Sequence, residues 1–368
     1  MVPFPATVGG VAVLLLTGST GMVGREILAR AVAEQRYDEI LCVIRPGSSG
    51  ADERLADVMR RSGVTGRNIR AVAGDVTEPG LGVQAADRRR ITHVIHGAAS
   101  VAFDLPPAEA RRINVGGTRN VLDLCSGLPQ LERLDAVSTC YVAGRRQGLV
   151  YEKDLGHACG FHNTYELSKY EAEGVLRSRM RDLPIAVHRP SIVVGDSRTG
   201  ATGAWKVLYW PLKVIARGRL PVIPYDPDCR LDIVPVDFVA SAILALAADA
   251  GTVGGTFHLA AGPGRDTTTG ELFPQIFRAL DRRPPVRVPP AVFRRFVRPA
   301  LQAVPSSRMR RTLRAGLVYR PYLELRVRFD TAQADAALAG TGVTCPRVVD
   351  YMDTIVRAAL ESDFGARG

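Results

Sequence analysis

The chain has 368 residues, which is long enough to bury a full hydrophobic core as one large domain with a lobe or as two closely associated domains. With 46% hydrophobic and 23% charged residues, its composition is that of a globular protein and excludes a disordered or fibrous chain. Its six cysteines are scattered without a C-x-x-C pair, which favours reduced thiols in a cytoplasmic protein over a disulfide framework. The apolar run Val11–Leu16 is too short to span a membrane, so we expect a strand there and no signal peptide.

The formal net charge of +11 is concentrated in one segment of the chain. Residues 282–328 contain 13 arginines, no lysine and one acid, Glu324, so this arginine-rich segment carries +12 and the remainder is close to neutral. A nucleic-acid-binding protein more often spreads its basic residues over the core module, and no nucleic-acid-reading motif accompanies these arginines. The charge therefore indicates a local role for this segment and argues against nucleic acid as a partner.

The first 190 residues alternate strand-like and helix-like patterns, which predicts an α/β fold with a doubly wound parallel sheet. The expected strands are Val11–Leu16, Ile40–Ile44, Arg70–Ala73, His93–His96, Leu134–Val137 and Ile185–His188. The expected helices are Val23–Glu34, Ala51–Arg61, Leu81–Arg89, Ala108–Ser126 and Thr164–Arg181.

The composition changes after the sixth expected strand. Residues 195–229 are richer in proline, glycine and aromatic residues, whereas Leu231–Asp237 and Thr256–Ala260 return to strand-like patterns. We therefore expect two interleaved regions. Residues 1–194 plus 230–262 would form a dinucleotide-binding domain, and residues 195–229 plus 263–368 a smaller substrate-binding lobe that includes the arginine-rich segment.

A glycine-rich turn directly follows the first expected strand. Its glycines are spaced G-x-x-G-x-x-G in the string TGSTGMVG, between an apolar strand and a helix. Such a turn presents free backbone N–H groups at a helix N-terminus, and its missing side chains let a diphosphate approach closely. The sequence therefore predicts a dinucleotide site that includes Gly18, Ser19, Thr20, Gly21, Met22, Val23 and Gly24.

Three later strand ends supply further candidate contacts with a dinucleotide. Arg45 follows the second strand, where an acid would bind a ribose 2′-hydroxyl and an arginine a 2′-phosphate, so this residue favours NADP(H) over NAD(H). An ordinary surface arginine is the alternative. Asp75 and Val76 follow the third strand, where an aspartate can reach the adenine edge. The small residues after the fourth strand would let the cofactor pass close to the backbone; they are Ala98, Ala99 and Ser100.

Tyr165 and Lys169 are four residues apart, so they share one face of the expected helix. A phenol is a poor acid at neutral pH, and a nearby ammonium group would bring the pKa of Tyr165 toward the range needed for proton transfer. Asn163 and Glu166 resemble a capping box at the start of this helix. The pair Tyr165 and Lys169 is therefore a candidate for acid catalysis.

A hydroxyl group lies at the expected end of the fifth strand. We assign Thr139, with Ser138 as its close rival, to hydrogen bonding with a substrate carbonyl. The order of glycine turn, hydroxyl and Tyr165 along the chain is more specific than each motif alone. His93 and His96 are three residues apart on a strand and so point to opposite faces, and we expect no metal site.

Over residues 11–260 the chain resembles an extended short-chain dehydrogenase/reductase, because it contains a series of motifs in the same order as that family. The motifs are TGSTGMVG, GDV, HGAAS, INVGGTRNVL, VSTCYVAG, YELSK, HRPSIVVG and DIVPVDFVA. Within that group, Arg45, the long stretch Pro46–Arg70, and YELSK followed by Ala172 and Glu173 are similar to the thioester reductase and fatty acyl-CoA reductase branch. The resemblance implies a Rossmann fold with a smaller C-terminal substrate lobe. It also implies an NADPH-dependent reductase that converts an acyl thioester into an aldehyde.

The resemblance gives each candidate residue a role. It implies that Thr139 and Tyr165 hold the carbonyl oxygen, that Tyr165 donates the proton, and that Lys169 binds the nicotinamide ribose and tunes Tyr165. It further implies that Asn114 helps to position Lys169 through water or backbone. In HRPSIVVG, the residues implied to contact the cofactor are Pro190, Ser191 and Ile192.

Several alternatives stay open at this point. The acyl donor would be coenzyme A, an acyl-carrier protein or a free carbonyl compound, and the alternative enzyme is an NAD(P)-dependent dehydrogenase or epimerase acting on a hydroxysteroid-like or sugar-like alcohol. The arginine-rich segment would be a solvated surface, bind the phosphates of coenzyme A or an acidic carrier protein, or contact anionic lipid. The expected location is cytoplasmic or peripheral to a membrane, and the oligomeric state is left open.

Overall fold

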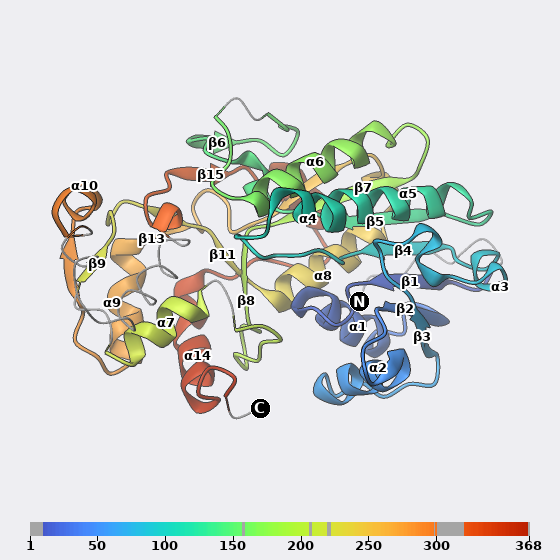
Figure 1. The fold of residues 1–368 in the computed structure, drawn as a ribbon, viewed down its shortest axis with the longest axis horizontal. Helices are drawn as coiled ribbons and strands as arrows, with labels where there is room; N and C mark the ends of the chain where they lie inside the picture. Colours follow the sequence, from blue (N-terminus) through green and yellow to red (C-terminus); the bar gives the residue numbers. More distant parts are fainter. Residues whose placement is uncertain are drawn as a thin grey trace.

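A computed structural model describes residues 10–156, 159–205, 208–218, 222–297, 299 and 320–366 (Figure 1). Its centre is a seven-stranded parallel sheet with the strand order β12-β7-β5-β4-β1-β2-β3. The strands are β1 (Val13–Thr17), β2 (Glu39–Ile44), β3 (Ile69–Ala73), β4 (His93–His96), β5 (Arg133–Val137), β7 (Ile185–Pro190) and β12 (Thr256–Leu259). The chain runs outward from β1 to β3 and then returns to β4 on the other side of β1. This reversal confirms the predicted doubly wound Rossmann sheet.

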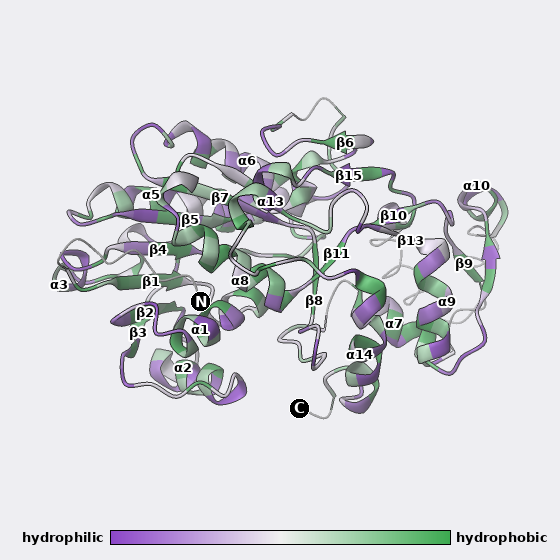
Figure 2. Ribbon diagram, turned by 180° about the vertical axis from the view of Figure 1, so that it is seen from behind, coloured by the Kyte–Doolittle hydropathy of each residue, from purple (hydrophilic) through white to green (hydrophobic). Residues whose placement is uncertain are grey.

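Helices cover both faces of the sheet because successive strand residues point to opposite sides. Leu14 and Leu16 of β1 share one core with α1 (Met22–Ala33), α2 (Gly50–Arg61) and α8 (Val236–Ala247). Val13 and Leu15 share the opposite core with α5 (Gly117–Ser126) and α6 (Thr164–Ser178). Figure 1 shows these two helical layers on either side of the strands, and Figure 2 shows the apolar residues along β1. A central parallel strand covered on both faces reads as the continuous apolar run seen in the sequence.

The predicted helix Ala108–Ser126 is wrong in one respect, because it is not continuous. It consists of α4 (Pro107–Arg111), the π-helical turn η2 (Arg112–Gly116) and α5. A π turn holds one more residue than an α-helical turn and is common beside functional sites. Asn114 lies in this turn and is buried.

Two other expected elements also differ from the structure. The predicted helix Leu81–Arg89 is reduced to the turn η1 (Pro79–Gly82) and the short helix α3 (Ala85–Arg88), since Leu81 has a φ of +56° that a helix does not allow. The run Leu231–Asp237 is not one strand. It contains the last residue of β10 (Arg230–Leu231) and all of β11 (Ile233–Pro235), after which α8 begins at Val236, so apolar character alone did not distinguish the start of a buried helix from a strand.

The second region consists of short elements around a core of its own. Its paired strands are β6 (Gly148–Val150) with β15 (Val327–Phe329), β8 (Ile192–Val194) with β11 (Ile233–Pro235), β9 (Val222–Pro224) with β14 (Val286–Val288), and β10 (Arg230–Leu231) with β13 (Thr267–Thr268). Its helices and turns are η3 (Cys140–Ala143), α7 (Tyr209–Ala216), α9 (Thr269–Ala279), α10 (Pro290–Val292), η5 (Phe293–Val297), η6 (Arg320–Leu323) and α14 (Val348–Glu361), whereas the turn η4 (Ala250–Thr252) follows α8 in the sheet region. Packing of α9 against α14 buries Leu272, Met352 and Ile355.

The chain returns to the sheet near its end. The helix α13 (Ala332–Leu338) packs Ala334 and Leu338 into the core formed by α1, α2 and α8. The division into two regions stays a proposal. The helix α13 falls within residues 263–368 but packs with the sheet region. Arg298 and residues 300–319 of the arginine-rich segment lie outside the described residues. In the described part of the chain, no helix combines the length and apolar character that crossing a membrane requires.

Candidate active site

The predicted site residues lie at one edge of the sheet. Gly18 follows β1, Ala98 follows β4, Thr139 follows β5 and Ser191 follows β7. These four strands are parallel neighbours, so the loops at their carboxyl ends lie side by side. In an open α/β sheet this edge, at the reversal of strand order, is where ligands bind.

The glycine turn lies tightly against the loop that follows β4. Gly18 has a φ of +83°, and a Cβ atom added there would lie 2.6 Å from the backbone nitrogen of Ala98. A Cβ atom on Gly24 would lie 2.2 Å from the carbonyl oxygen of Gly18. Gly21 precedes α1 and has no side chain to cover the first N–H groups of the helix. The result is a cradle of bare backbone at a helix N-terminus, which fits the diphosphate of a dinucleotide.

The remaining residues of the turn differ in exposure. Ser19 is buried, Thr20 is exposed, and Met22 and Val23 are partly buried. The sulfur of Met22 accepts a hydrogen bond from the hydroxyl of Thr202 at 3.3 Å, so a loop of the second region crosses the start of α1. The two regions therefore meet beside the cradle.

Two guanidinium groups lie at the end of β2. The Arg45 side chain is 71% exposed, and its Nη1 lies 3.9 Å from a carboxylate oxygen of Asp75. Arg54 of α2 donates a hydrogen bond to the carbonyl oxygen of Arg45. Sequence reasoning identified Arg45 and missed Arg54, because only the fold of α2 over the strand end brings the second arginine there. Their charge suits a phosphate group.

The loop after β3 has a fixed turn geometry. A carboxylate oxygen of Asp75 accepts hydrogen bonds from the backbone nitrogen of Thr77 at 2.9 Å and from its hydroxyl at 3.0 Å. The carbonyl oxygen of Val76 accepts from the Asn120 amide at 2.9 Å. These bonds hold Asp75 and Val76 in place after β3, where the sequence predicted an adenine contact.

Asn114 holds the loop after β4, which contains Ala98, Ala99 and Ser100. Its side-chain oxygen accepts from the Ser100 backbone nitrogen at 2.8 Å, and its side-chain nitrogen donates to the Ser100 carbonyl at 3.1 Å. The same nitrogen donates to the Ser168 hydroxyl at 2.9 Å. Asn114 therefore contacts the residue next to Lys169 and connects α6 to the loop after β4.

The structure separates the two candidate hydroxyl groups. The Ser138 hydroxyl donates to the buried carboxylate of Glu173 at 2.7 Å, which directs it into the core under α6. The Thr139 hydroxyl lies near the Tyr165 phenol and lowers the pKa of that phenol. Thr139 also donates to the carbonyl oxygen of Pro190 at 3.3 Å. Thr139, and not Ser138, therefore lies beside the candidate acid.

The residues after β7 lie next to this pair. The Ser191 backbone nitrogen donates to the Leu259 carbonyl at 3.2 Å, which ties the chain to β12, and Ile192 begins β8. Pro190 thus lies beside Thr139, and Ser191 and Ile192 follow it along the chain. Within the described residues, no group of three or more His, Cys, Asp and Glu side chains is arranged to hold a metal ion.

The pKa of Tyr165 moves in the direction opposite to the one expected. Burial raises it to about 12, the nearby Thr139 hydroxyl opposes this rise, and the charge of Glu166 adds to it. Lys169 is not among the groups that shift it, and its ammonium group donates to the Val137 carbonyl at 2.8 Å. Tyr165 is therefore protonated at neutral pH and has a proton to donate.

Lys169 is buried on the same face of α6. Burial lowers the pKa of Lys169 to about 8, although the nearby carboxylate of Glu173 acts in the opposite direction. The carbonyl of Val137, the last residue of β5, fixes its position. Lys169 thus places a donor at the strand end, within the same cluster as Thr139 and Tyr165.

An aromatic wall next to Tyr165 was missed by sequence reasoning. The ring of Phe103 lies 5.7 Å from that of Tyr165 and 5.6 Å from that of Tyr322. Tyr322 comes from the arginine-rich segment, and its hydroxyl donates to the Glu166 carboxylate at 2.6 Å and accepts from the Asn163 amide at 2.8 Å. The sequence carried no signal for this contact, because the two segments are 156 residues apart.

The start of α6 forms only half of the expected capping box. The side-chain oxygen of Asn163 accepts from the Glu166 backbone nitrogen at 2.9 Å, as predicted. The Glu166 carboxylate does not return to Asn163. It accepts instead from the His162 backbone nitrogen at 2.8 Å and from Tyr322. The acid thereby joins the helix start to the second region.

Comparisons with known proteins agree with this geometry. The fatty acyl-CoA reductase wat of Drosophila melanogaster is 30% identical over 279 residues, which cover 64% of this chain and 54% of that protein. The adenylate-forming reductase Nps10 of Heterobasidion annosum is 30% identical over 249 residues, which cover 63% of this chain and 22% of that protein. The chain thus spans about half the length of the first relative and a smaller part of the second.

Solved structures match nearly the whole chain. The terminal R domain from the myxalamid PKS-NRPS biosynthetic pathway has a TM-score of 0.83 at 27% identity, over 98% of this chain and 93% of that domain. A dTDP-glucose 4,6-dehydratase from Streptomyces venezuelae with NAD bound has a TM-score of 0.67 at 21% identity, over 95% of this chain and 97% of that one, and shares the fold. The model of the NAD-binding male sterility protein family matches residues 16–243. Since that match covers more than half of the sequence, the chain belongs to the male sterility protein family, on an extended short-chain dehydrogenase/reductase fold that binds a nicotinamide dinucleotide.

Proposed function

We propose that this protein is an NADPH-dependent reductase that converts an acyl thioester into an aldehyde. The observation that carries the proposal is the cluster of Thr139, Tyr165 and Lys169, which lies at the strand edge beside the glycine cradle. The similarity to a fatty acyl-CoA reductase and to the terminal R domain supports the same reaction class. Thr139, Tyr165 and Lys169 are the residues to which we assign the chemistry, and Asn114 is a positioning residue.

The bound cofactor would supply a hydride to the carbonyl carbon of the thioester. Thr139 and Tyr165 would donate hydrogen bonds to the carbonyl oxygen, where negative charge develops, and donors already in place there stabilise the transition state. Tyr165 would transfer its proton to that oxygen. The resulting hemithioacetal collapses to an aldehyde and a free thiol. The Lys169 ammonium would bind the nicotinamide ribose.

The cofactor residues would divide into three groups. The cradle of Gly18 to Gly24 would hold the diphosphate, and Ala98 to Ser100 with Pro190 to Ile192 would line the nicotinamide side. Asp75 and Val76 would contact the adenine. Arg45, joined by Arg54, would bind the 2′-phosphate, so we propose NADP(H) as the natural cofactor.

The Arg45→Asp variant is expected to weaken NADPH binding far more than NADH binding. The substitution removes a charged hydrogen bond to the 2′-phosphate, which we expect to cost roughly tenfold to a hundredfold in affinity for NADPH. Fluorescence titration of both reduced cofactors measures the two dissociation constants. Equal losses for both would contradict the role of Arg45, and the exposed Arg89→Asp variant is the control for charge reversal elsewhere.

The rate is expected to fall as the pH rises through about 8. Lys169 has its pKa lowered to about 8, so the ammonium that would bind the ribose is present below that pH and is lost above it. Tyr165, with a pKa of about 12, keeps its proton over the same range. The pH profile of kcat/KM for NADPH, measured on both sides of the Lys169 pKa, reports the groups of the free enzyme. A flat profile would contradict the assignment of Lys169.

The substrate class is tested with purified protein and NADPH. Acyl-CoA esters of graded length and an acylated carrier protein are compared with free aldehydes and sugar nucleotides, with products identified by mass spectrometry. Thioester-dependent oxidation of NADPH with release of an aldehyde supports the proposal and distinguishes coenzyme A from a carrier protein as donor. Activity found only as oxidation of a secondary alcohol with NAD would overturn it in favour of a dehydrogenase or epimerase.

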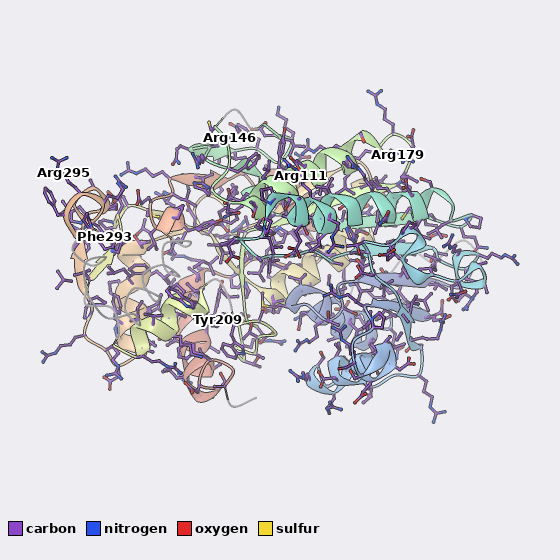
Figure 3. All side chains as sticks on the ribbon, viewed as in Figure 1. Arg111, Arg146, Arg179, Tyr209, Phe293 and Arg295 are labelled. Atoms are coloured by element: carbon purple, nitrogen blue, oxygen red, sulfur yellow. The ribbon has the colours of Figure 1, made fainter. Side chains whose placement is uncertain are left out.

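We also propose a cytoplasmic protein that docks on anionic membranes through residues 286–296, the lobe tip. This tip exposes Val286, Val292 and Phe296 and contains three arginines and no acid. It lies at the end of the second region farthest from the sheet, with Arg295 pointing outward (Figure 3). Apolar side chains that insert among headgroups, with basic residues around them, suit an anionic lipid surface.

The Phe296→Glu variant is expected to lose flotation with anionic vesicles. The substitution places a carboxylate where an apolar ring would insert, and repulsion by the anionic surface adds to the loss. Flotation with phosphatidylserine-containing and with neutral vesicles measures binding. Val253→Glu is the matched control, because Val253 is an exposed valine outside the tip. Wild-type protein that stays unbound to both vesicle types would exclude this docking.

A further inference from the structure

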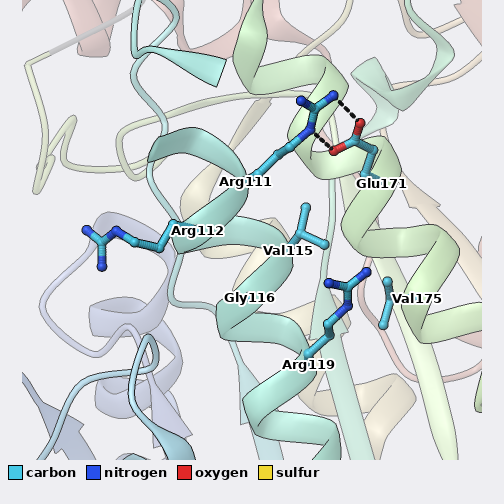
Figure 4. A pocket seen from close by; sticks show the side chains of 7 residues that line it. All are labelled: Arg111, Arg112, Val115, Gly116, Arg119, Glu171 and Val175. Atoms are coloured by element: carbon cyan, nitrogen blue, oxygen red, sulfur yellow. Dashed lines mark hydrogen bonds and ion pairs between the residues drawn. The ribbon is translucent and has the colours of Figure 1, made fainter. Parts of the chain in front are cut away.

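A hollow of about 460 Å³ lies on the outer face of the helical layer formed by α4, η2, α5 and α6 (Figure 4). It lies on the side of α6 away from the candidate site, since Glu171 and Val175 project from a different face of the helix than Tyr165 and Lys169. Its lining residues are Arg111, Arg112, Val115, Gly116, Arg119, Glu171 and Val175. We call this hollow the arginine groove.

The groove carries a surplus of positive charge. Three guanidinium groups and a single carboxylate line it. Glu171 accepts two parallel hydrogen bonds from Arg111, at 2.8 and 2.7 Å, and so neutralises that residue. Among the described residues, neither Arg112 nor Arg119 has an acidic partner, which leaves a formal charge of +2.

The two unpaired arginines of the groove lie on different sides of it. Figure 4 shows Arg119 reaching from α5 toward Val175 of α6, while Arg112 leaves the turn on the side away from α6. Val115 is buried, so the floor between the helices is apolar and excludes water from one side of an ion bound to Arg119. A guanidinium group presents donors in a plane that matches two phosphate oxygens. Glu171 fixes Arg111 as a rigid wall.

We propose that the arginine groove binds a phosphate-bearing small molecule with at least two negative charges. This site is separate from the cradle that would hold the cofactor diphosphate. A second copy of the chain is a poorer occupant, because a two-fold symmetric contact centred on the groove would bring like charges together. The net charge of +2 attracts such an anion.

Inorganic pyrophosphate is the probe, added to the full chain saturated with NADPH so that the cofactor site is already filled. Calorimetric titration at constant ionic strength compares wild type with the Arg112→Gln/Arg119→Gln double variant, which removes both unpaired charges from exposed positions. The matched control is Arg67→Gln/Arg89→Gln, two exposed arginines outside the groove. We expect saturable binding to wild type and control, and affinity at least about tenfold lower in the groove variant.

Three results would overturn the inference. Wild-type protein that binds no pyrophosphate has no such site, and equal affinity in wild type and groove variant places the ion elsewhere. Light scattering that shows a wild-type dimer and a monomeric groove variant makes the groove an interface between copies. These readouts measure binding and mass without turnover, so they are independent of the proposed reductase activity.

Discussion

Replacing Tyr165 by phenylalanine is expected to lower kcat by roughly 10²- to 10⁴-fold while NADPH still binds. The substitution removes one oxygen atom, which is both the partner of Thr139 and the proposed proton donor. The ring and its contact with Phe103 remain, and so do the glycine cradle and Lys169. The loss should therefore appear in turnover and leave the dissociation constant for NADPH near its wild-type value.

The matched control is Tyr170→Phe, which removes a phenol oxygen from the same helix. Tyr170 packs against Phe161 at 5.1 Å and has no place in the proposed chemistry. Single-turnover rates and cofactor titrations are compared for both variants. Turnover by Tyr165→Phe within a few-fold of wild type would mean that another group donates the proton.

Replacing Glu173 by glutamine is expected to destabilise the fold by roughly 3–5 kcal/mol. Its carboxylate is fully buried and accepts hydrogen bonds from Arg189, Arg177 and Ser138. Burial disfavours the charged form, but the two arginines and Ser138 outweigh it and hold the pKa of Glu173 below its usual value. The variant would leave the fully buried guanidinium of Arg189 without its counter-charge.

Denaturant unfolding of wild type and variant at neutral pH measures this loss. The control is Glu171→Gln, two residues away, whose ion pair with Arg111 lies at the surface and should contribute far less. A depressed acid pKa stabilises the fold above the unfolded pKa, and this contribution disappears as the pH falls through the folded value. The difference between Glu173→Gln and wild type should therefore shrink in acid. Equal losses for the two variants would contradict the buried network.

The sheet could be read from the sequence because each central strand is covered on both faces and therefore appears as an uninterrupted apolar run. The expected and observed limits of the fourth strand are both His93–His96. Helix interruptions were harder to foresee. The π turn at Asn114 depends on contacts with Ser100 and Ser168 from other loops, and local propensity does not encode them.

The candidate site was partly readable for the same reason. Thr139 and Tyr165 follow motifs with fixed spacing, and the structure brings their hydroxyl groups together. The sequence could not distinguish Thr139 from Ser138 as the candidate hydroxyl, because the hydrogen bond from Ser138 to Glu173 is visible only in the folded chain. The sequence predicted a lowered pKa for Tyr165, whereas the structure raises it. Burial causes the rise, and burial depends on the folded chain and not on the local sequence. The Lys169 ammonium group, which was expected to lower this pKa, donates to the Val137 carbonyl.

Tyr322 has a consequence for any attempt to change what the enzyme accepts. The Tyr322 hydroxyl donates a hydrogen bond to the buried carboxylate of Glu166, the residue next to Tyr165 in the chain. Tyr322 itself belongs to the segment that would shape the substrate region. A chimera that exchanged this segment for that of a relative would leave Glu166 facing an empty position unless the incoming chain brought a phenol to the same place. The segment proposed to shape the substrate region and the position of the proposed proton donor are therefore coupled through Tyr322, and a graft would have to preserve this contact.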